Sequence, residues 1–180
     1  AYVSKKANAY SDIQAVAAMK LLAPNLRRVF NNGKDREARE AMMLGSTFAG
    51  IAFSNASVAL VHGMSRPIGA LYHVPHGLSN AMLLPAVTEY SIPAAEQRYA
   101  DAARVMGIAQ ASDTNIKANH KLMDELFAIN RELEVPTLAE FGISRTQFFE
   151  NLNTKAQQAL ASGSPANNPR VPDADSIIEI

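Results

Sequence analysis

Apolar residues recur with a helical period along almost the whole chain, and Gly and Pro interrupt that period at intervals. No stretch alternates apolar and polar side chains for long enough to predict a β-strand. The pattern therefore predicts an all-α protein, a multi-helix bundle, in which no change of composition marks a boundary between domains.

The interruptions set the expected helix boundaries. We expect helices over residues 1–22, 26–31, 35–61, 94–106, 114–133 and 145–161, another that begins at Pro75, and a last one over residues 173–180. The 35–61 helix starts with charged turns and becomes apolar on nearly every side, which is typical of a central helix with a buried end. The breakers between Gly63 and Pro75 predict a loop.

Composition narrows the range of partners. The chain has 180 residues, of which 48% are hydrophobic and 19% charged, as in ordinary globular domains. Lys+Arg and Asp+Glu both number 17, so no net field favours nucleic acid or an anionic membrane, and we expect neither as a partner. We expect no signal peptide and no membrane span. The absence of cysteine suits a cytoplasmic protein and leaves His, Asp and Glu as the metal donors.

Three of the four histidines cluster around the predicted loop. His62 would end the 35–61 helix and His76 would lie in the first turn of the next, so a loop that folds back could place both imidazoles on one metal ion. Histidines at helix ends also cap carbonyls or pack in cores, and the spacing alone leaves both readings open. His73 fits either a substrate pocket or a surface loop, and His120 is expected to be exposed.

One long stretch carries a family resemblance. Residues 60–85 read LVHGMSRPIGALYHVPHGLSNAMLLP and closely resemble the signature of the iron-containing, or group III, alcohol dehydrogenases. The start of the chain is similar to the end of that family's first metal-binding helix, and residues 168–172 are similar to its C-terminal segment. The resemblance therefore extends over essentially the whole chain.

The resemblance implies an architecture and a chemistry. Residues 1–180 would form the C-terminal α-helical metal and substrate domain, similar to that of dehydroquinate synthase and incomplete at its N-terminus, with the α/β nucleotide-binding domain absent from this chain. A ferrous ion, or Zn²⁺, would polarise the oxygen of a small alcohol, aldehyde or ketone. NAD or NADP would be bound mainly by the missing domain. A homo-oligomer, most simply a dimer, is expected.

The resemblance also assigns residues. It places the last two of the family's metal ligands, one Asp and three His in all, on His62 and His76. The remaining Asp and His belong to an Asp-x-x-x-His segment expected just before Ala1. Arg66 stands where many members carry a histidine close to the nicotinamide, and it either binds an anionic group or forms a salt bridge at the cleft rim. We take Arg66 and His73, a polar residue of the same cleft, as candidate catalytic residues.

Three functions are consistent with the sequence. The first is an NAD(P)-linked, metal-dependent alcohol dehydrogenase, of which this chain alone would be inactive. The second is a related reductase of the lactaldehyde, propanediol, maleylacetate or hydroxyacid type, because Arg66 would suit an acidic substrate. The third is a truncated, non-catalytic helical module.

Overall fold

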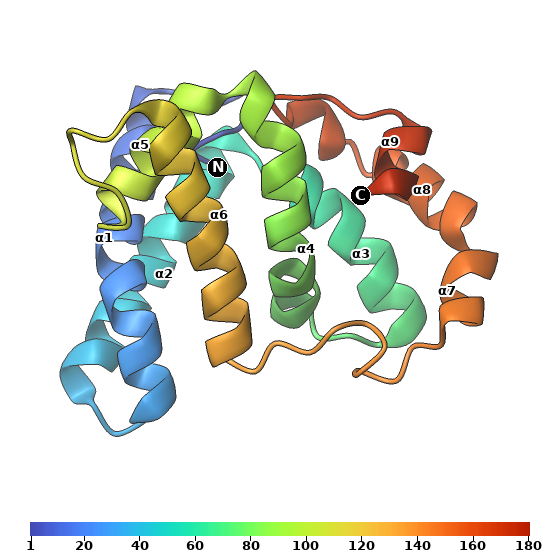
Figure 1. The fold of residues 1–180 in the computed structure, drawn as a ribbon, viewed down its shortest axis with the longest axis horizontal. Coiled ribbons are helices and arrows are strands. Elements are labelled where there is room, and N and C mark those ends of the chain that lie inside the picture. Colours follow the sequence, from blue (N-terminus) through green and yellow to red (C-terminus); the bar gives the residue numbers. More distant parts are fainter. The chain divides into compact units, whose positions relative to one another are not determined.

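The computed structural model describes residues 1–180, and every regular element in it is a helix, which confirms the predicted all-α class. The chain divides into two compact units, residues 1–57 with 95–125 and residues 58–94 with 126–180 (Figure 1). No single helix is both long and apolar enough to cross a membrane, and only the helices Arg36–Ala56 and Leu60–Tyr72 taken together, with the break between them, pass that test. The elements are α1 (Ala9–Asn31), α2 (Arg36–Ala56), α3 (Leu60–Tyr72), α4 (His76–Ser91), the 3-10 turn η1 (Ile92–Ala94), α5 (Glu96–Val105), α6 (Asn115–Glu132), α7 (Arg145–Glu150), α8 (Leu152–Ala161), the 3-10 turn η2 (Pro165–Asn167) and α9 (Ala174–Glu179).

The first unit is built on α1 and α2, which pack along each other as the blue and cyan helices of Figure 1. The residues buried between them are mostly small, so the two backbones approach closely. Gly45 shows how closely, because a Cβ there would lie 2.8 Å from the side chain of Leu22. A small residue of α2 therefore admits the neighbouring helix at this position.

Helix α1 corrects the expected boundaries, because it continues through Pro24 where we predicted one helix to end and another to begin. Proline removes one backbone donor and crowds the preceding turn, at a cost of about 3 kcal/mol or more. Next to that gap, the side chain of Asn25 donates to the carbonyl of Leu21 at 2.8 Å. We attribute the continuity of α1 to this hydrogen bond and to the packing on α2, which local sequence cannot report.

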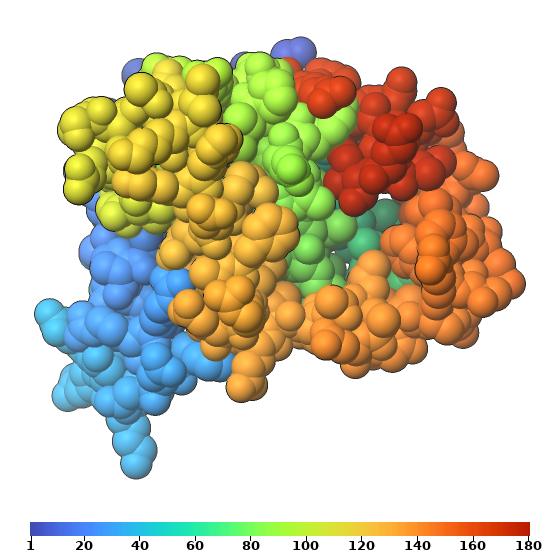
Figure 2. Space-filling view, in the orientation of Figure 1, coloured from blue at the N-terminus to red at the C-terminus, as the bar shows by residue number.

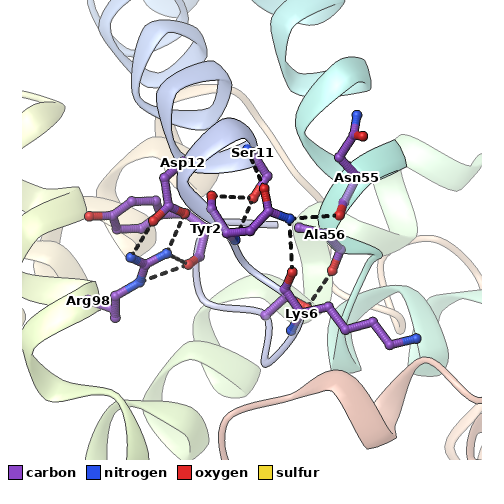
Figure 3. Close-up of polar contacts among 9 residues, drawn as sticks. Tyr2, Lys6, Ser11, Asp12, Asn55, Ala56 and Arg98 are labelled. Atoms are coloured by element: carbon purple, nitrogen blue, oxygen red, sulfur yellow. Dashed lines mark hydrogen bonds and ion pairs between the residues drawn. The ribbon is translucent and has the colours of Figure 1, made fainter.

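The first residues of the chain are held by Arg98 of α5 (Figure 3). Its guanidinium donates to both carboxylate oxygens of Asp12, at 2.7 and 2.6 Å, and to the carbonyl of Tyr2. It also stacks over the Tyr2 ring, 3.7 Å from the ring centroid. A second anchor is the buried Ser4, whose hydroxyl donates to the carbonyl of Ala56 at 2.6 Å. The segment before α1 is therefore tied to α1, α2 and α5 at once.

Helix α2 is shorter and more exposed than its sequence indicated. It ends at Ala56 and is followed by Ser57 with a positive φ of 61°, whereas we predicted a helix that continued to residue 61. The predicted burial on nearly every side is also wrong, because Met43 is 72% and Phe53 47% exposed. No Gly or Pro marks the break. The carbonyl of Val58, freed by the interruption, accepts a hydrogen bond from the side chain of Asn167 at 3.1 Å.

Helix α3 replaces most of the loop predicted between Gly63 and Pro75, of which only residues 73–75 are non-helical. The residues buried along it follow a helical spacing and include Pro67 itself. The ring of Pro67 crowds the carbonyl of the residue four positions earlier, which is Gly63. Burial of the apolar face thus outweighs the three breakers inside the helix, Gly63, Pro67 and Gly69. These buried apolar residues are Leu60, Met64, Pro67 and Ile68.

In the second unit α3 packs against α4, α8 and η2, and α9 packs on α8. Its larger core cluster joins Leu60 and Met64 of α3 with residues of the other three helices, namely Val87, Ala156, Ala159 and Ile177. At Gly63 the approach of η2 is so close that an added Cβ would lie 2.7 Å from Cγ of the buried Pro165. Glycine is therefore required where α3 passes η2, one residue after His62.

The helix predicted over 145–161 is two helices, because the carbonyls at the junction bind side chains instead of the next turn. The carbonyl of Phe148 accepts from the ammonium of Lys155 at 2.5 Å. The carbonyl of Gln147 accepts from the Tyr72 hydroxyl at 3.1 Å and from the Asn151 amide at 3.3 Å. α7 therefore stops at Glu150 and α8 restarts at Leu152.

The remaining boundaries agree with the sequence. Helix α4 begins immediately after Pro75, and α5, α6 and α9 lie within a few residues of their predicted ranges. The capping box of Ser144 and Gln147 is formed. Gly107 and Gly163 have φ of 78° and 74°, the left-handed conformation that ends helices at glycine.

Substituting Gly63→Ala tests the contact between α3 and η2. We expect the free energy of unfolding to fall by about 1–3 kcal/mol, because the added methyl overfills a packed contact. Gly50→Ala in α2 is the matched control, since nothing lies within 4 Å of an added Cβ there, and helix propensity predicts a gain of up to about 1 kcal/mol. Urea unfolding followed by circular dichroism measures both changes, and equal stability of Gly63→Ala and wild type would contradict the packing argument.

Candidate metal-binding site

The site forms where α4 returns beside α3 after a three-residue connection, residues 73–75. His73 ends α3 in the left-handed conformation, with φ 56° and ψ 29°. His62 lies in the first turn of α3, not at the end of the preceding helix as we predicted, and His76 is the first residue of α4. Their imidazole rings lie edge to face with centroids 5.2 Å apart. The structure therefore brings together the two histidines that the sequence singled out.

Burial gives His62 an unusual protonation state. Desolvation, with the neighbouring His76 as the next cause, lowers the pKa of His62 from 6.5 to about 4. Removing an imidazolium from water and placing it beside a second imidazole both disfavour the charged form. His62 is therefore neutral at physiological pH, which is the form of histidine that binds metal ions.

Polar neighbours hold the backbone and one ring of the pair. The buried hydroxyls of Ser65 and Ser79 donate to the carbonyls of His62 and His76, at 3.3 and 3.0 Å. The amide of Asn80 lies 3.1 Å from Nε2 of His76. The amide oxygen of Asn80 is buried and has no hydrogen-bond partner.

The other candidate residues are placed differently. Arg66 follows His62 by one helical turn, is exposed, and forms no ion pair or side-chain hydrogen bond. His73 is also exposed, and its side chain contacts neither His62 nor His76 through a hydrogen bond or ring contact. His120, on α6 in the first unit, is exposed as expected. No group of three or more His, Asp or Glu side chains converges in the structure.

Comparison with known proteins now decides the family. The sequence model described as "Fe-containing alcohol dehydrogenase family, C-terminal" matches residues 1–180. The chain belongs to the Fe-containing alcohol dehydrogenase family. This confirms the resemblance carried by residues 60–85.

Two curated relatives indicate how much of a family member this chain represents. It is 35% identical over 181 residues to the 1,3-propanediol dehydrogenase of Klebsiella pneumoniae, which covers 100% of this chain and 46% of the relative. It is also 35% identical over 180 residues to the lactaldehyde reductase of Escherichia coli K12, covering 99% of this chain and 46% of that one. The chain thus spans about half the length of these Fe-containing alcohol dehydrogenases.

Solved structures of the family share the fold. A 1,3-propanediol oxidoreductase superposes with a TM-score of 0.92 at 34% identity, and an alcohol dehydrogenase from Oenococcus oeni with 0.91 at 31% identity. Each match covers 99% of this chain and 46% of the other. The helical arrangement of this chain is therefore that of part of a larger family member.

Sequence reasoning missed Asn80, although a signal for it exists. Asn80 follows His76 by four positions in a segment that we predicted to be helical, and residues four apart share a helix face. It missed Ser65 and Ser79 because serines in helices most often serve local packing. Their contribution depends on burial, which the structure alone reveals.

The pKa of His62 gives a direct test of this site in the metal-free protein. We expect an NMR titration of its ring protons to show a midpoint near pH 4, and His76→Ala to raise it because one source of repulsion is removed. In urea the midpoint should return to about 6.5. Because the folded pKa is the lower one, the stability contributed by neutral His62 is complete above pH 6.5 and is lost as the pH falls towards 4. A folded-state midpoint above 6 would contradict the burial of this ring.

Proposed function

We propose that this chain is the metal- and substrate-binding part of an NAD(P)-linked, metal-dependent oxidoreductase that interconverts a small alcohol and its aldehyde or ketone. The observation that carries the proposal is the pair of imidazoles 5.2 Å apart, formed by His62 and His76 inside the family's signature stretch. Membership of the Fe-containing alcohol dehydrogenase family supports the reaction class.

The donor set fits a divalent metal ion of that family. His62 is neutral at physiological pH because of its lowered pKa, so its ring nitrogen is free to coordinate. His76 faces an amide whose oxygen has no protein partner, which leaves one buried acceptor for a bound water or substrate hydroxyl. Imidazole suits both iron and zinc. The further Asp and His that the resemblance implies are not supplied by the residues around this pair.

Each part of the chain has a separate task in this proposal. His62 and His76 hold Fe²⁺ or Zn²⁺, which when bound supplies a Lewis acid for the substrate oxygen. The packing of α3 on η2 and α8 keeps the first turn of α3 in place, and Ser65 and Ser79 fix its backbone and that of α4. NAD or NADP would be held mainly by the nucleotide-binding half that the resemblance implies. A cytoplasmic location and a homodimer also stay predictions.

Metal content tests the proposal. We expect the wild-type protein, loaded anaerobically with Fe²⁺ or with Zn²⁺ and then desalted, to retain metal. His62→Ala and His76→Ala should each lower the metal affinity at least tenfold. Removing a ligand costs more than changing a residue that only orients a ligand, and such changes already weaken metal sites about 10–100-fold. His120→Ala is the control, since this exposed histidine belongs to the other unit. Inductively coupled plasma mass spectrometry and competition with a chelator measure the result. Equal retention by all three variants would contradict the site, and a folded wild type without metal would favour the non-catalytic module.

A second candidate function rests on Arg66. Its guanidinium is exposed and unpaired one turn after His62, so it is available to a carboxylate or other anionic group on a substrate. This favours a related reductase that acts on an acidic substrate, of the hydroxyacid or maleylacetate type. A salt bridge at a cleft rim, the other role we considered for Arg66, does not form within this chain.

Substrate preference in the full-length enzyme separates the two candidates. If Arg66 binds an anionic substrate group, Arg66→Ala lowers kcat/KM for a hydroxyacid by about tenfold or more, the effect of losing a hydrogen bond to a charged group, and leaves a simple alcohol nearly unchanged. Arg36→Ala, a change at an exposed residue of α2, provides the control. Equal losses on both substrates would assign Arg66 to the general architecture of the site.

A further inference from the structure

The second unit contains a cavity of about 250 Å³ that is lined almost entirely by apolar side chains. Met64, Pro67 and Ile68 of α3 form one wall, and Leu83 of α4 adjoins them. The rest of the lining comes from the segments between residues 138 and 159 and from the last residues of the chain. Figure 2 shows the hollow between the orange and red segments, with the teal-green α3 at its floor. Neither His62 nor His76 lines this cavity.

A buried lysine interrupts the apolar lining. Lys155 of α8 is only 5% exposed, although lysine is almost never fully buried without a partner. Its ammonium donates to the carbonyl of Phe148 at 2.5 Å and to the hydroxyl of Tyr72 at 3.0 Å. It also lies 3.6 Å from the centroid of the Phe148 ring. All of these partners are neutral, and no carboxylate pairs with Lys155.

The charge of this ammonium therefore has no counter-ion inside the protein. Two of its three N–H donors are satisfied by Tyr72 and Phe148, which leaves one donor and the full positive charge. A buried charge without a counter-ion is strongly unfavourable, whereas a partner that supplies the opposite charge removes much of that penalty. A lysine without a counter-ion in the lining of an apolar cavity matches an aliphatic chain with one anionic end.

We propose that this cavity binds a linear aliphatic carboxylate, with the carboxylate on Lys155 and the chain along α3. The size is suitable, because a cavity of about 150 Å³ already accommodates benzene. The apolar walls account for the chain and the cation accounts for the anionic end. Glu179 also lines the cavity without pairing with Lys155, so its carboxylate weakens anion binding and sets a limit on affinity.

Calorimetric titration of the protein with octanoate tests the proposal. We expect octanoate to bind wild type, Lys155→Met to weaken it by about tenfold or more, and Glu179→Gln to tighten it. 1-Octanol should bind wild type and Lys155→Met with similar affinity, because 1-octanol has no carboxylate to pair with the lysine. Lys20→Met, which removes an exposed lysine of α1, is the matched control and should change nothing. No octanoate binding by wild type, or equal binding by Lys155→Met, overturns the proposal.

A second measurement locates the ligand and does not depend on the Lys155 variant folding. Intermolecular NOEs from the terminal methyl of octanoate to the methyl of Met64 are expected, since Met64 lines the cavity. Leu152→Trp should abolish these NOEs by filling the space, with circular dichroism as the check on folding. NOEs only to residues outside the cavity would overturn the assignment. Metal retention by His62 and His76 is independent of either result, so failure here leaves the proposed function unaffected.

Discussion

The close approach of α3 to the turn η2 is the contact on which the candidate site depends. Gly63 is the residue that permits it, because any side chain would overlap the ring of Pro165. His62 precedes this contact directly, so the position of its imidazole is set by how deeply α3 packs. Leu60 and Met64, on the same helix, carry that packing into the core formed with α4, α8 and α9. The metal-binding candidate is therefore an extension of a packed core and not a surface loop.

Burial also determines the chemistry of the pair. The same desolvation that stabilises the packed α3 disfavours an imidazolium at His62 and lowers its pKa. A neutral imidazole next to a second ring is poor at forming salt bridges and well suited to a metal ion. His76 is more exposed and is oriented by Asn80 instead. The two rings are thus positioned by different interactions, His62 by the packing of α3 and His76 by its hydrogen bond with Asn80.

Lys155 illustrates how one side chain can shape both a helix boundary and a cavity. Its hydrogen bond to the Phe148 carbonyl removes an acceptor from the helical ladder and separates α7 from α8. Lys155 also belongs to the lining of an apolar cavity, and no protein carboxylate pairs with its buried ammonium. Tyr72, at the end of α3, contributes to both effects through its hydroxyl. The end of α3 and the first turn of α8 are consequently coupled through polar contacts as well as through the core.

The sequence by itself determined the all-α class, the helix ends before Gly107 and Gly163, and the family, because each depends on local chemistry or on a long specific motif. Only the tertiary structure decided which Gly and Pro residues interrupt a helix. Pro24 and Pro67 lie within helices, since packing outweighs a local penalty of about 3 kcal/mol. Conversely, the breaks after α2 and α7 carry no Gly or Pro, and the carbonyls there bond to side chains distant in sequence, such as Asn167 and Tyr72. The tertiary structure also decided the proximity of the two imidazoles. The motif identified His62 and His76, but their distance depends on the packing of α4 beside α3.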